Sequence, residues 1–549
     1  MDPDSTMRLV RLAATLHDGT PVDVIFRDGS GEGFALYWSH LLDLPLVLLS
    51  APLRLVAPAT GNWPLPPALH WAALAMGPIF MGLLGLAVVW ACSPFVSREW
   101  RWLAALSVPV SLPILAYGVP GNVHHHVPLV IVAVMVAGWA VRAPQIGTRA
   151  GWRAGLWAGV GIWLSPETVP FSLMAIGGLG LAWLIGPNDR KTVRALGAAG
   201  PGMLLVSVLA FAVDPGEQGL TATAVDRISL VYVALALALC LVGALAIGVD
   251  RTRCSGSARL ALGLCAAALP LAIWLAAFPA VLAGPEGVIG DEQRAAFFDH
   301  IVEMMPVNSP DNFLRCLLTG ALAASFAAGI TIVHRSTLAG YVALCAAATL
   351  FLGLQHRRFA AYPSVLGAIA LPWAMTVLSR PRIARTRAAV VARMICVTAF
   401  LLLPHLPDAA EAVAVHRQPI PATSCSIAKV RALLATHADE VVLALPDETP
   451  ALLFISDVRT VGSLYHRNFA GFMRAYRAWR SDPEYAGQDA FRATNAKLVL
   501  ACAGRKRNSL VADLPQGTLF DRLNAADPPE WLEPIAKDPG SGFILYRAR

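Results

Sequence analysis

The sequence is poor in charged residues: only 14% of its 549 residues are Asp, Glu, Lys or Arg, whereas a soluble protein is typically about a quarter charged. It contains no glycine-rich phosphate loop, no Walker sequence and no zinc-finger spacing of Cys and His. It also has no internal repeat and no low-complexity tract. The formal net charge of +7 comes from arginines in short loops between apolar runs, so it is not a sign of nucleic-acid binding.

Apolar residues dominate instead, since 56% of the residues are hydrophobic and the mean hydropathy is +0.58. They form runs of roughly 17–25 residues, long enough to cross a bilayer as helices. The sequence therefore predicts a polytopic α-helical membrane protein with about twelve spans. The expected spans cover residues 68–93, 102–118, 126–142, 154–165, 167–187, 195–213, 228–249, 259–283, 313–333, 338–354, 363–378 and 388–404. The fourth is too short to span alone.

The arginines predict the orientation of these spans, because cytoplasmic loops carry an excess of Lys and Arg. Loops with arginine alternate with loops nearly free of Lys and Arg, and the arginine loops hold, among others, Arg98, Arg142, Arg190, Arg251, Arg335 and Arg380. The opposite, extracytoplasmic side then receives residues 1–67, 284–312 and 405–549. Because the chain would begin outside without a signal peptide, we also expect one more helix upstream of Met1.

Two polar regions flank the expected transmembrane domain, 68–404. In the first loop, 1–67, the short apolar stretch 41–56 predicts a re-entrant or interfacial helix. Residues 405–549 predict a small extracytoplasmic α/β domain, with strands at 440–445, 497–502 and 543–546 and helices at 425–436, 469–481 and 519–524. Its two cysteines, Cys425 and Cys502, either form a disulfide or remain free thiols.

Three consecutive histidines, His124, His125 and His126, stand at the junction of two apolar runs. Imidazole is the commonest metal ligand in proteins, and it also binds phosphate or relays protons. A polar turn that meets lipid headgroups is the competing interpretation. The predicted topology places the triplet on the same side as the acidic residues of both extracytoplasmic loops, and this shared side favours a functional site.

Carboxylates and a pair of arginines are expected beside the triplet. Asp2 and Asp4 lie near the start of the chain, and Glu303 lies in the long loop 284–312. Arg357 and Arg358 break the charge rule, and the guanidinium fork matches phosphate oxygens, although arginines that snorkel to headgroups are the alternative. A cation and arginines beside a bilayer suggest a substrate with a lipid-linked phosphate or pyrophosphate leaving group.

Several stretches resemble one family. Asp2-Pro3-Asp4-Ser5-Thr6-Met7-Arg8-Leu9-Val10 is similar to the acidic first-loop motif of bacterial membrane glycosyltransferases of the GT-C superfamily, and the stretch 37–45 is similar to their Trp-Ser-x-Leu-x-Asp-x-Pro segment. The stretch 121–126 resembles their Asp-His-His motif, which is also the second acidic motif of archaeal oligosaccharyltransferase subunits. Further matches begin at Glu167 and at Tyr465-His466-Arg467-Asn468.

The resemblance implies an inverting transfer of a sugar or oligosaccharide from a polyprenyl-phosphate-type donor to a glycan, lipid or protein acceptor. The reaction would occur on the outer face of the bacterial cytoplasmic membrane, among membrane lipids, and would be assisted by Mg²⁺ or Mn²⁺. By position, Asp4 or Asp2 would be the catalytic first-loop carboxylate, Glu303 would bind acceptor and metal, and Arg357 or Arg358 would hold the donor phosphate. The implied metal ligands are Asp4, His124, His126 and Glu303. Other candidates on the matching stretches are Arg8, His125, Glu167, Tyr465, His466 and Arg467.

The sequence departs from the family pattern in two places. Position 124 is His where the family has Asp, which favours Mn²⁺ or Zn²⁺ over Mg²⁺ and leaves open a weakened or lost metal site. The Trp-Trp-Asp acceptor motif of oligosaccharyltransferases is absent, so an asparagine acceptor is not implied. A transporter or flippase is the alternative function, although transporters carry charges at the membrane midplane and inverted repeats. A catalytically dead scaffold is a third.

Overall fold

The computed structural model describes residues 2–56, 67–186, 190–284, 290–298, 301–380, 386–415, 425–505, 507, 514–538 and 540–549. Within these ranges, nine helices are long and apolar enough to cross a membrane, and two bent helix pairs raise this number to at most eleven. Every span expected from the sequence coincides with a helix or with a bent pair. The polytopic helical fold is therefore confirmed, and the number of twelve spans stays a prediction.

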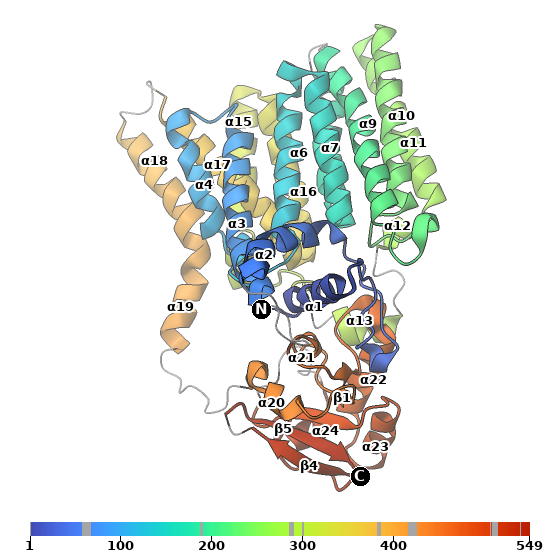
Figure 1. The fold of residues 1–549 in the computed structure, drawn as a ribbon. Coiled ribbons are helices and arrows are strands. Elements are labelled where there is room, and N and C mark those ends of the chain that lie inside the picture. Colours follow the sequence, from blue (N-terminus) through green and yellow to red (C-terminus); the bar gives the residue numbers. More distant parts are fainter. Residues whose placement is uncertain are drawn as a thin grey trace.

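Helices α3 to α11 and α14 to α18 form the bundle (Figure 1). Their bounds are α3 (Pro67–Cys92), α4 (Arg101–Val110), α5 (Leu112–Gly118), α6 (His126–Ile146), α7 (Thr148–Leu164), α8 (Val169–Ile185), α9 (Arg190–Val213), α10 (Leu230–Arg251), α11 (Gly256–Ala277), α14 (Pro310–Cys316), α15 (Leu318–His334), α16 (Thr337–Gln355), α17 (Ala361–Leu378) and α18 (Arg387–Val397). The fourth expected span begins earlier than predicted, and it ends where Ser165 adopts an extended conformation.

Glycines bring α7 and α9 into backbone contact. A Cβ atom on Gly151 would lie 1.9 Å from the carbonyl oxygen of Ala195, and one on Gly155 would lie 2.0 Å from that of Ala199. In lipid, helices associate through close packing of small residues because the apolar solvent supplies no hydrophobic drive. These two glycines therefore allow α7 and α9 to pack with their backbones in contact.

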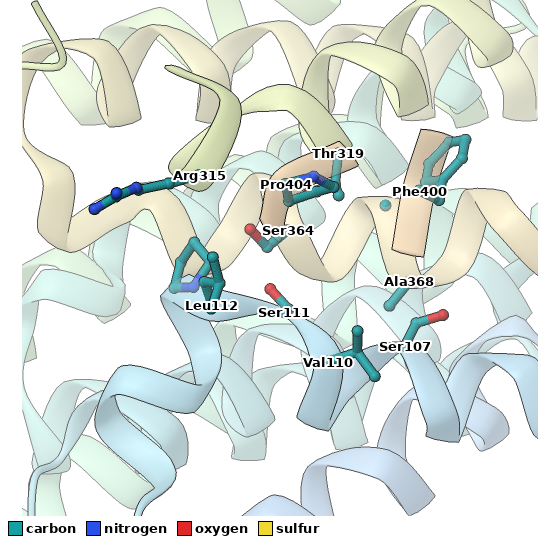
Figure 2. A pocket seen from close by; sticks show the side chains of 12 residues that line it. Ser107, Val110, Ser111, Leu112, Arg315, Thr319, Ser364, Ala368, Phe400 and Pro404 are labelled. Carbon is teal, nitrogen blue, oxygen red and sulfur yellow. The ribbon is translucent and has the colours of Figure 1, made fainter. Parts of the chain in front are cut away.

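Two spans are broken near the same place. The axis bends by 66° between α4 and α5 and by 68° between α14 and α15. The imidazole of His405, at the end of the short helix Leu403–His405, lies with Nε2 2.8 Å from the carbonyl oxygen of Val110, which the break frees. A small cavity of about 10 Å³, lined by both polar and apolar side chains, adjoins the break (Figure 2), and this volume suits about one water molecule.

The first loop and the C-terminal sheet lie at one end of the bundle (Figure 1). Helix α1 (Pro3–Asp18) begins with Asp2 as N-cap and Pro3 in its first turn, both of which favour helix initiation. Helix α2 (Asp43–Val56) confirms the short helix expected at 41–56. Asp43 joins the two helices, because its carboxylate accepts hydrogen bonds from Arg8 at 3.2 Å and Arg11 at 2.6 Å. The short helices α12 (Ala280–Ala283) and α13 (Asp291–Phe297) lie at the same end.

The C-terminal part contains a five-stranded sheet of order β2-β1-β3-β5-β4. Its strands are β1 (Val441–Leu443), β2 (Arg459–Thr460), β3 (Leu498–Cys502), β4 (Leu532–Lys537) and β5 (Phe543–Ala548). β1 is parallel to β2 and β3, whereas β5 is antiparallel to β3 and β4. The helices of this part are α19 (Leu406–Val415), α20 (Arg431–Leu434), α21 (Thr449–Ile455), α22 (Phe469–Arg480), α23 (Tyr485–Arg492) and α24 (Leu519–Asn524).

The expected strands at β1, β3 and β5 and the expected helices at α22 and α24 are present. The helix expected at 425–436 is shorter and interrupted: Ile427–Lys429 form a 3-10 turn, and Arg431–Leu434 form α20. Cys425 accounts for the later start. Its φ of 39° lies in the left-handed region, which a helix cannot include, and it forms a disulfide with Cys502 with the Cα atoms 5.7 Å apart. The bridge, one of the two alternatives for these cysteines, is therefore present.

Candidate active site and cation cluster

The histidine triplet forms the start of α6. The chain turns into this helix after Gly121, whose φ of 84° suits glycine. The rings of His124 and His126 stack with their centroids 5.3 Å apart, and His125 and His126 are only 7% and 6% exposed. Imidazoles packed this closely and withdrawn from water need polar partners.

The start of α1 provides the first of these partners. Asp2 Oδ1 lies 2.7 Å from His124 Nε2, and Asp2 Oδ2 accepts a hydrogen bond of 2.6 Å from the Ser5 hydroxyl. Burial alone would raise the pKa of Asp2, but the hydrogen bond and charge of His124 and the bonds from Ser5 hold it well below its usual value. Ser5 Oγ also accepts a hydrogen bond from the backbone N–H of Val123 at 2.7 Å, so α1 is fixed directly to the triplet.

Asp4 lies on the other side of the same imidazole. Its Oδ2 is 3.9 Å from His124 Nδ1, which is too long for a hydrogen bond. Within the described part of the chain, this buried Nδ1 has no hydrogen-bond partner. Burial lowers the pKa of His124, but the hydrogen bond to Asp2 and the charges of Asp2, Asp4 and Glu303 raise it to about 9. Burial raises the pKa of Asp4 to about 6. The negative charges of Asp2 and Glu303 also raise it, whereas the charge of His124 lowers it.

Glu303 reaches the cluster from the long loop. Its Oε2 accepts a hydrogen bond of 3.0 Å from the hydroxyl of Tyr117, in α5, and lies 3.8 Å from His126 Nε2. The loop is held there through its backbone, because the N–H of Arg358 donates to the Glu303 carbonyl at 2.9 Å and the N–H of Arg357 donates to the Met305 carbonyl at 3.1 Å. The break between α4 and α5 brings Tyr117 to this position.

The two neighbouring arginines point in different directions. The Arg358 guanidinium forms an ion pair with Glu167 and contacts Met304 Sδ at 3.1 Å. Arg357 directs its Nε at the carbonyl oxygen of Pro306, 3.4 Å away in an exposed contact. Of the two, the geometry therefore brings Arg358 to the carboxylates of the cluster.

Two groups of side chains could supply ligand atoms for a cation. The four residues expected from the sequence lie in two pairs: Asp4 Oδ2 is 3.9 Å from His124 Nδ1, and Glu303 Oε2 is 3.8 Å from His126 Nε2. The second group consists of His125, His126 and Glu167, whose ligand atoms all lie within 4.8 Å of one another. Glu167 is already neutralised by Arg358, whose positive charge opposes a second cation nearby. In the first set, the unpartnered nitrogen of His124 faces Asp4 and fits a shared cation.

Other predicted residues lie around this cluster. Arg8 is buried between Asp43 and the ring of Trp38, 4.8 Å from its centroid, which is a structural position in α1. His466 and Arg467 both contact Asp226: His466 Nε2 lies 2.8 Å from Oδ2, and Arg467 donates from Nη2 to Oδ1 at 2.7 Å. Tyr465 donates to the carbonyl oxygen of Pro3 at 3.3 Å, and it lies beside Asp4.

Two residues of the site were missed from the sequence, Tyr117 and Asp226. Tyr117 lies seven positions before His124, so its place at the end of an apolar run beside the triplet was the available signal. Asp226 lies in a loop that was expected on the same side as the triplet. Its partners come from 240 positions away, and no local pattern indicates them.

An apolar cavity of about 110 Å³ lies between α3, α6, α8, α16 and α17. Phe171, two positions after the start of α8, and Tyr362, in the first turn of α17, both line it. These residues follow Glu167 and Arg358 by four positions each. The cavity therefore extends into the bundle from the helix ends that carry the charged cluster.

The fold defines the class: the chain is a polytopic helical membrane protein with the fold of the archaeal oligosaccharyltransferase structures. It is similar to the oligosaccharyltransferase AglB of Archaeoglobus fulgidus in complex with an inhibitory peptide and a dolichol-phosphate, with a TM-score of 0.69 at 13% sequence identity over 91% of this chain and 65% of that chain. The chain thus spans about two thirds of the length of this protein.

Two further structures of the Archaeoglobus oligosaccharyltransferase are similar. The complex with Zn and sulfate has a TM-score of 0.65 at 13% identity over 100% of this chain and 69% of that one. The form tethered to an acceptor peptide with the NVT sequon has a TM-score of 0.64 at 15% identity over 92% and 65%. At these identities the likeness concerns the fold. No protein-family model and no curated protein matches the sequence.

Proposed function

We propose that the chain is a membrane glycosyltransferase that moves a sugar or oligosaccharide from a polyprenyl-phosphate-type donor to an acceptor. The observation that carries the proposal is convergence: Asp4, His124, Glu303 and Arg358 come from four distant parts of the chain and meet at one end of the bundle. Displacement of a phosphate-linked sugar builds negative charge on the leaving oxygen, and cationic groups beside a carboxylate suit this reaction.

The cation site of the proposal is the set Asp4, His124, His126 and Glu303. Asp2 then acts behind His124: its hydrogen bond to Nε2 orients the ring so that Nδ1 faces Asp4, as carboxylates do behind metal-binding histidines. A bound divalent cation would supply positive charge to the leaving phosphate. Two histidines in the set favour Mn²⁺ or Zn²⁺ over Mg²⁺, and the Zn complex of the Archaeoglobus enzyme supports a site of this kind.

Arg358 is the proposed ligand of the donor phosphate. Its guanidinium is 16% exposed and bound to Glu167, so it is held in place for a bidentate contact with phosphate oxygens. The apolar cavity beside Phe171 and Tyr362, about 110 Å³ in volume, suits only a short part of the hydrocarbon chain of such a donor. The dolichol-phosphate bound by the Archaeoglobus enzyme supports a polyprenyl-phosphate lipid.

Asp4 is the proposed acceptor-side carboxylate, with 34% of its side chain exposed. It would orient the acceptor hydroxyl or amide, or remove its proton, opposite the departing phosphate, which gives inversion at the sugar carbon. Tyr465 beside Asp4, and His466 and Arg467 behind it, border the acceptor side. The Archaeoglobus enzyme has been tethered to an acceptor peptide; for this chain the acceptor class stays open between glycan, lipid and protein.

The proposal includes the outer face of the bacterial cytoplasmic membrane as the place of reaction. Residues 1–67 would be the first extracytoplasmic loop, 68–404 the transmembrane domain and 405–549 an extracytoplasmic domain. The Cys425–Cys502 disulfide supports this orientation, since disulfides persist in oxidising compartments. A transporter is less well supported, because the carboxylates and histidines of the cluster gather at one end of the helices, whereas transporters bind near the midplane.

The test is release of lipid phosphate by the purified protein from a labelled polyprenyl-phosphate sugar, with Mn²⁺, Mg²⁺ or Zn²⁺ present. The wild-type protein should release the lipid phosphate, and Asp4→Asn should not. If the wild-type protein releases none with any of the three cations and with glycan, lipid and peptide acceptors, the proposal is wrong.

A further inference from the structure

Residues 27–32 of the first loop are inserted into the C-terminal sheet domain. The carbonyl of Arg27 accepts a hydrogen bond from the N–H of Thr460, in β2, at 2.8 Å, and the Arg27 guanidinium donates to the carbonyls of Leu453 and Ser456, at 2.7 Å each. The hydroxyl of Ser30 donates to the Thr494 carbonyl at 2.7 Å. The loop thus lies along the edge of the sheet as a part of that domain.

Asp28 is the centre of this insertion. It is fully buried, and its carboxylate accepts from Thr460 Oγ1 at 2.9 Å, from Asn468 Nδ2 at 3.0 Å and from both the N–H, at 3.2 Å, and the hydroxyl of Ser463. Its own neighbour Gly29 donates a fifth bond at 2.8 Å. None of these donors carries a charge, so a buried carboxylate is held by neutral groups alone, which is costly unless each bond is made.

At this contact, a side chain in place of Gly471 would press against the backbone of Gly29. A Cβ on Gly471, in the first turn of α22, would lie 3.1 Å from Gly29 Cα, and one on Gly29 would lie 3.4 Å from Asn468 Oδ1. The loop and the domain are therefore matched in shape as well as in hydrogen bonding.

The segment that Asp28 binds also carries Tyr465. Ser463 and Asn468, two donors to Asp28, lie on either side of this tyrosine in the sequence. The Tyr465 ring is 3% exposed; it stacks on Phe34 at 5.5 Å and contacts Trp38 edge-on at 5.4 Å. Its hydroxyl reaches the Pro3 carbonyl, between Asp2 and Asp4.

We propose that Asp28 is a positioning residue of the candidate active site: by binding Ser463 and Asn468 around Tyr465, it fixes the sheet domain against the start of α1. The carboxylates of Asp2 and Asp4 are thereby set in front of the histidine triplet. This inference rests on the proposed function for its effect on catalysis. Its structural part, that α1 depends on Asp28 through Tyr465, stands by itself.

The experiment compares backbone hydrogen exchange and lipid phosphate release in the full chain in lipid nanodiscs. Asp28→Asn keeps the shape of the side chain but removes the charge that the donors satisfy. We expect exchange at the amides of residues 6–10 in α1 to rise about tenfold or more, while strands β3 and β5 exchange as in the wild type. Glu32→Gln is the matched control, because Glu32 makes only an exposed contact with Arg474 in the same loop–domain contact, and it should leave α1 unchanged.

In the release assay, Asp28→Asn should lower kcat about tenfold or more with little change in the KM for the donor, because the donor side is untouched. Tyr465→Phe should lower kcat as well, and the double variant should lose less than the product of the two effects, since both act along one path. Multiplied effects would contradict action through Tyr465.

The structural outcomes are separable from those of the proposed function. If α1 exchanges as in the wild type in Asp28→Asn, the proposal is overturned, whatever the activity. Asp28→Asn could loosen the whole sheet, and Ser463→Ala is therefore the milder second variant, because it removes only one donor. Ser463→Ala should still raise exchange in α1 alone. Equal loosening of α1 and the sheet in both variants makes Asp28 a purely structural residue and overturns the proposal. A wild-type protein without release activity contradicts the proposed function, but hydrogen exchange still tests the structural part of this proposal.

Discussion

His124 Nε2 lies 2.7 Å from Asp2 Oδ1, and this contact joins the first helix to the histidine triplet across 122 positions of sequence. It turns the opposite ring nitrogen toward Asp4, which is the only carboxylate among the described residues that an ion-pair distance of 4.0 Å or less connects to that nitrogen. In the proposed function the two aspartates therefore have different roles: Asp2 orients the imidazole, and Asp4 contacts the cation and the acceptor.

The first prediction separates these roles. Asp4→Asn should lower lipid phosphate release by about 10²–10⁴-fold, because it removes the group that orients or deprotonates the acceptor, whereas Asp2→Asn should cost about 10–100-fold, as the loss of a residue behind a metal ligand does. Asp18→Asn, at the far end of α1, is the matched control and should be neutral. Equal losses in Asp2→Asn and Asp4→Asn would contradict the division of roles.

The second prediction distinguishes the neighbouring arginines. Arg358→Lys should lower kcat about 10²-fold or more, because lysine cannot hold Glu167 and at the same time make the bidentate phosphate contact proposed for the guanidinium. Arg357→Lys should stay within about twofold of the wild type, since that side chain points to the Pro306 carbonyl. Release kinetics at saturating donor decide between them, and a larger effect of Arg357→Lys would reverse the assignment.

The third prediction concerns the identity of the cation. After treatment with a chelator, activity should return with Mn²⁺ or Zn²⁺ more than with Mg²⁺, because two histidines are softer ligands than carboxylates. His124→Asp should shift the preference toward Mg²⁺. Full activity in the chelator with no added cation would show that the cluster works without a metal.

The fourth prediction is a pH dependence of the contact between the sheet domain and the bundle. Burial alone would raise the pKa of Asp226, but the hydrogen bonds and charges of His466 and Arg467 hold it well below its usual value. A carboxylate with a lowered pKa stabilises the folded state above its unfolded pKa of roughly 3.9, and this stabilisation is lost as the pH falls toward the folded value. Thermal unfolding between pH 7 and pH 3 should therefore show a steeper loss in the wild type than in Asp226→Asn. Parallel curves would contradict this contribution.

The fifth prediction tests the disulfide. Cys425→Ser should lower the free energy of unfolding of the sheet domain by about 2–5 kcal/mol, because the bridge closes a long loop, here across 77 positions. Cys265→Ser is the control, since Cys265 is a free and exposed cysteine. Thermal melting with and without reductant provides the measurement: the wild type should lose stability on reduction, and Cys425→Ser should not respond.

The sequence predicted those parts of the site that interrupt a local pattern of residues. The triplet interrupts two apolar runs, and Arg358 breaks the alternation of charged loops, so both stand out without a structure. The long helices of the bundle were expected from their hydropathy. Strand β4 was missed because its residues Glu533, Pro534 and Ile535 are exposed at the sheet edge and show no apolar alternation.

The remaining parts depend on contacts between distant segments. In the sequence, Asp28 is one of several acidic residues in a polar loop. Only the fold places it beside its hydrogen-bond donors, which lie more than 430 positions away. Asp226 becomes identifiable in the same way, through His466 and Arg467. The difference between Arg357 and Arg358 depends on which side of a short 3-10 turn faces the cluster. Composition and periodicity do not show which of two consecutive side chains points to that side.

Backbone contact along Gly151 and Gly155 makes one flank of the bundle a closed seam, since not even a methyl group fits between α7 and α9. A long lipid that diffuses in the plane of the membrane cannot pass between these two helices without separating their backbones. The flank of α8 and α16 offers an apolar cavity instead. Under the proposed function, donor and acceptor would then approach the same carboxylates from different directions, the one sideways out of the bilayer and the other from the aqueous phase.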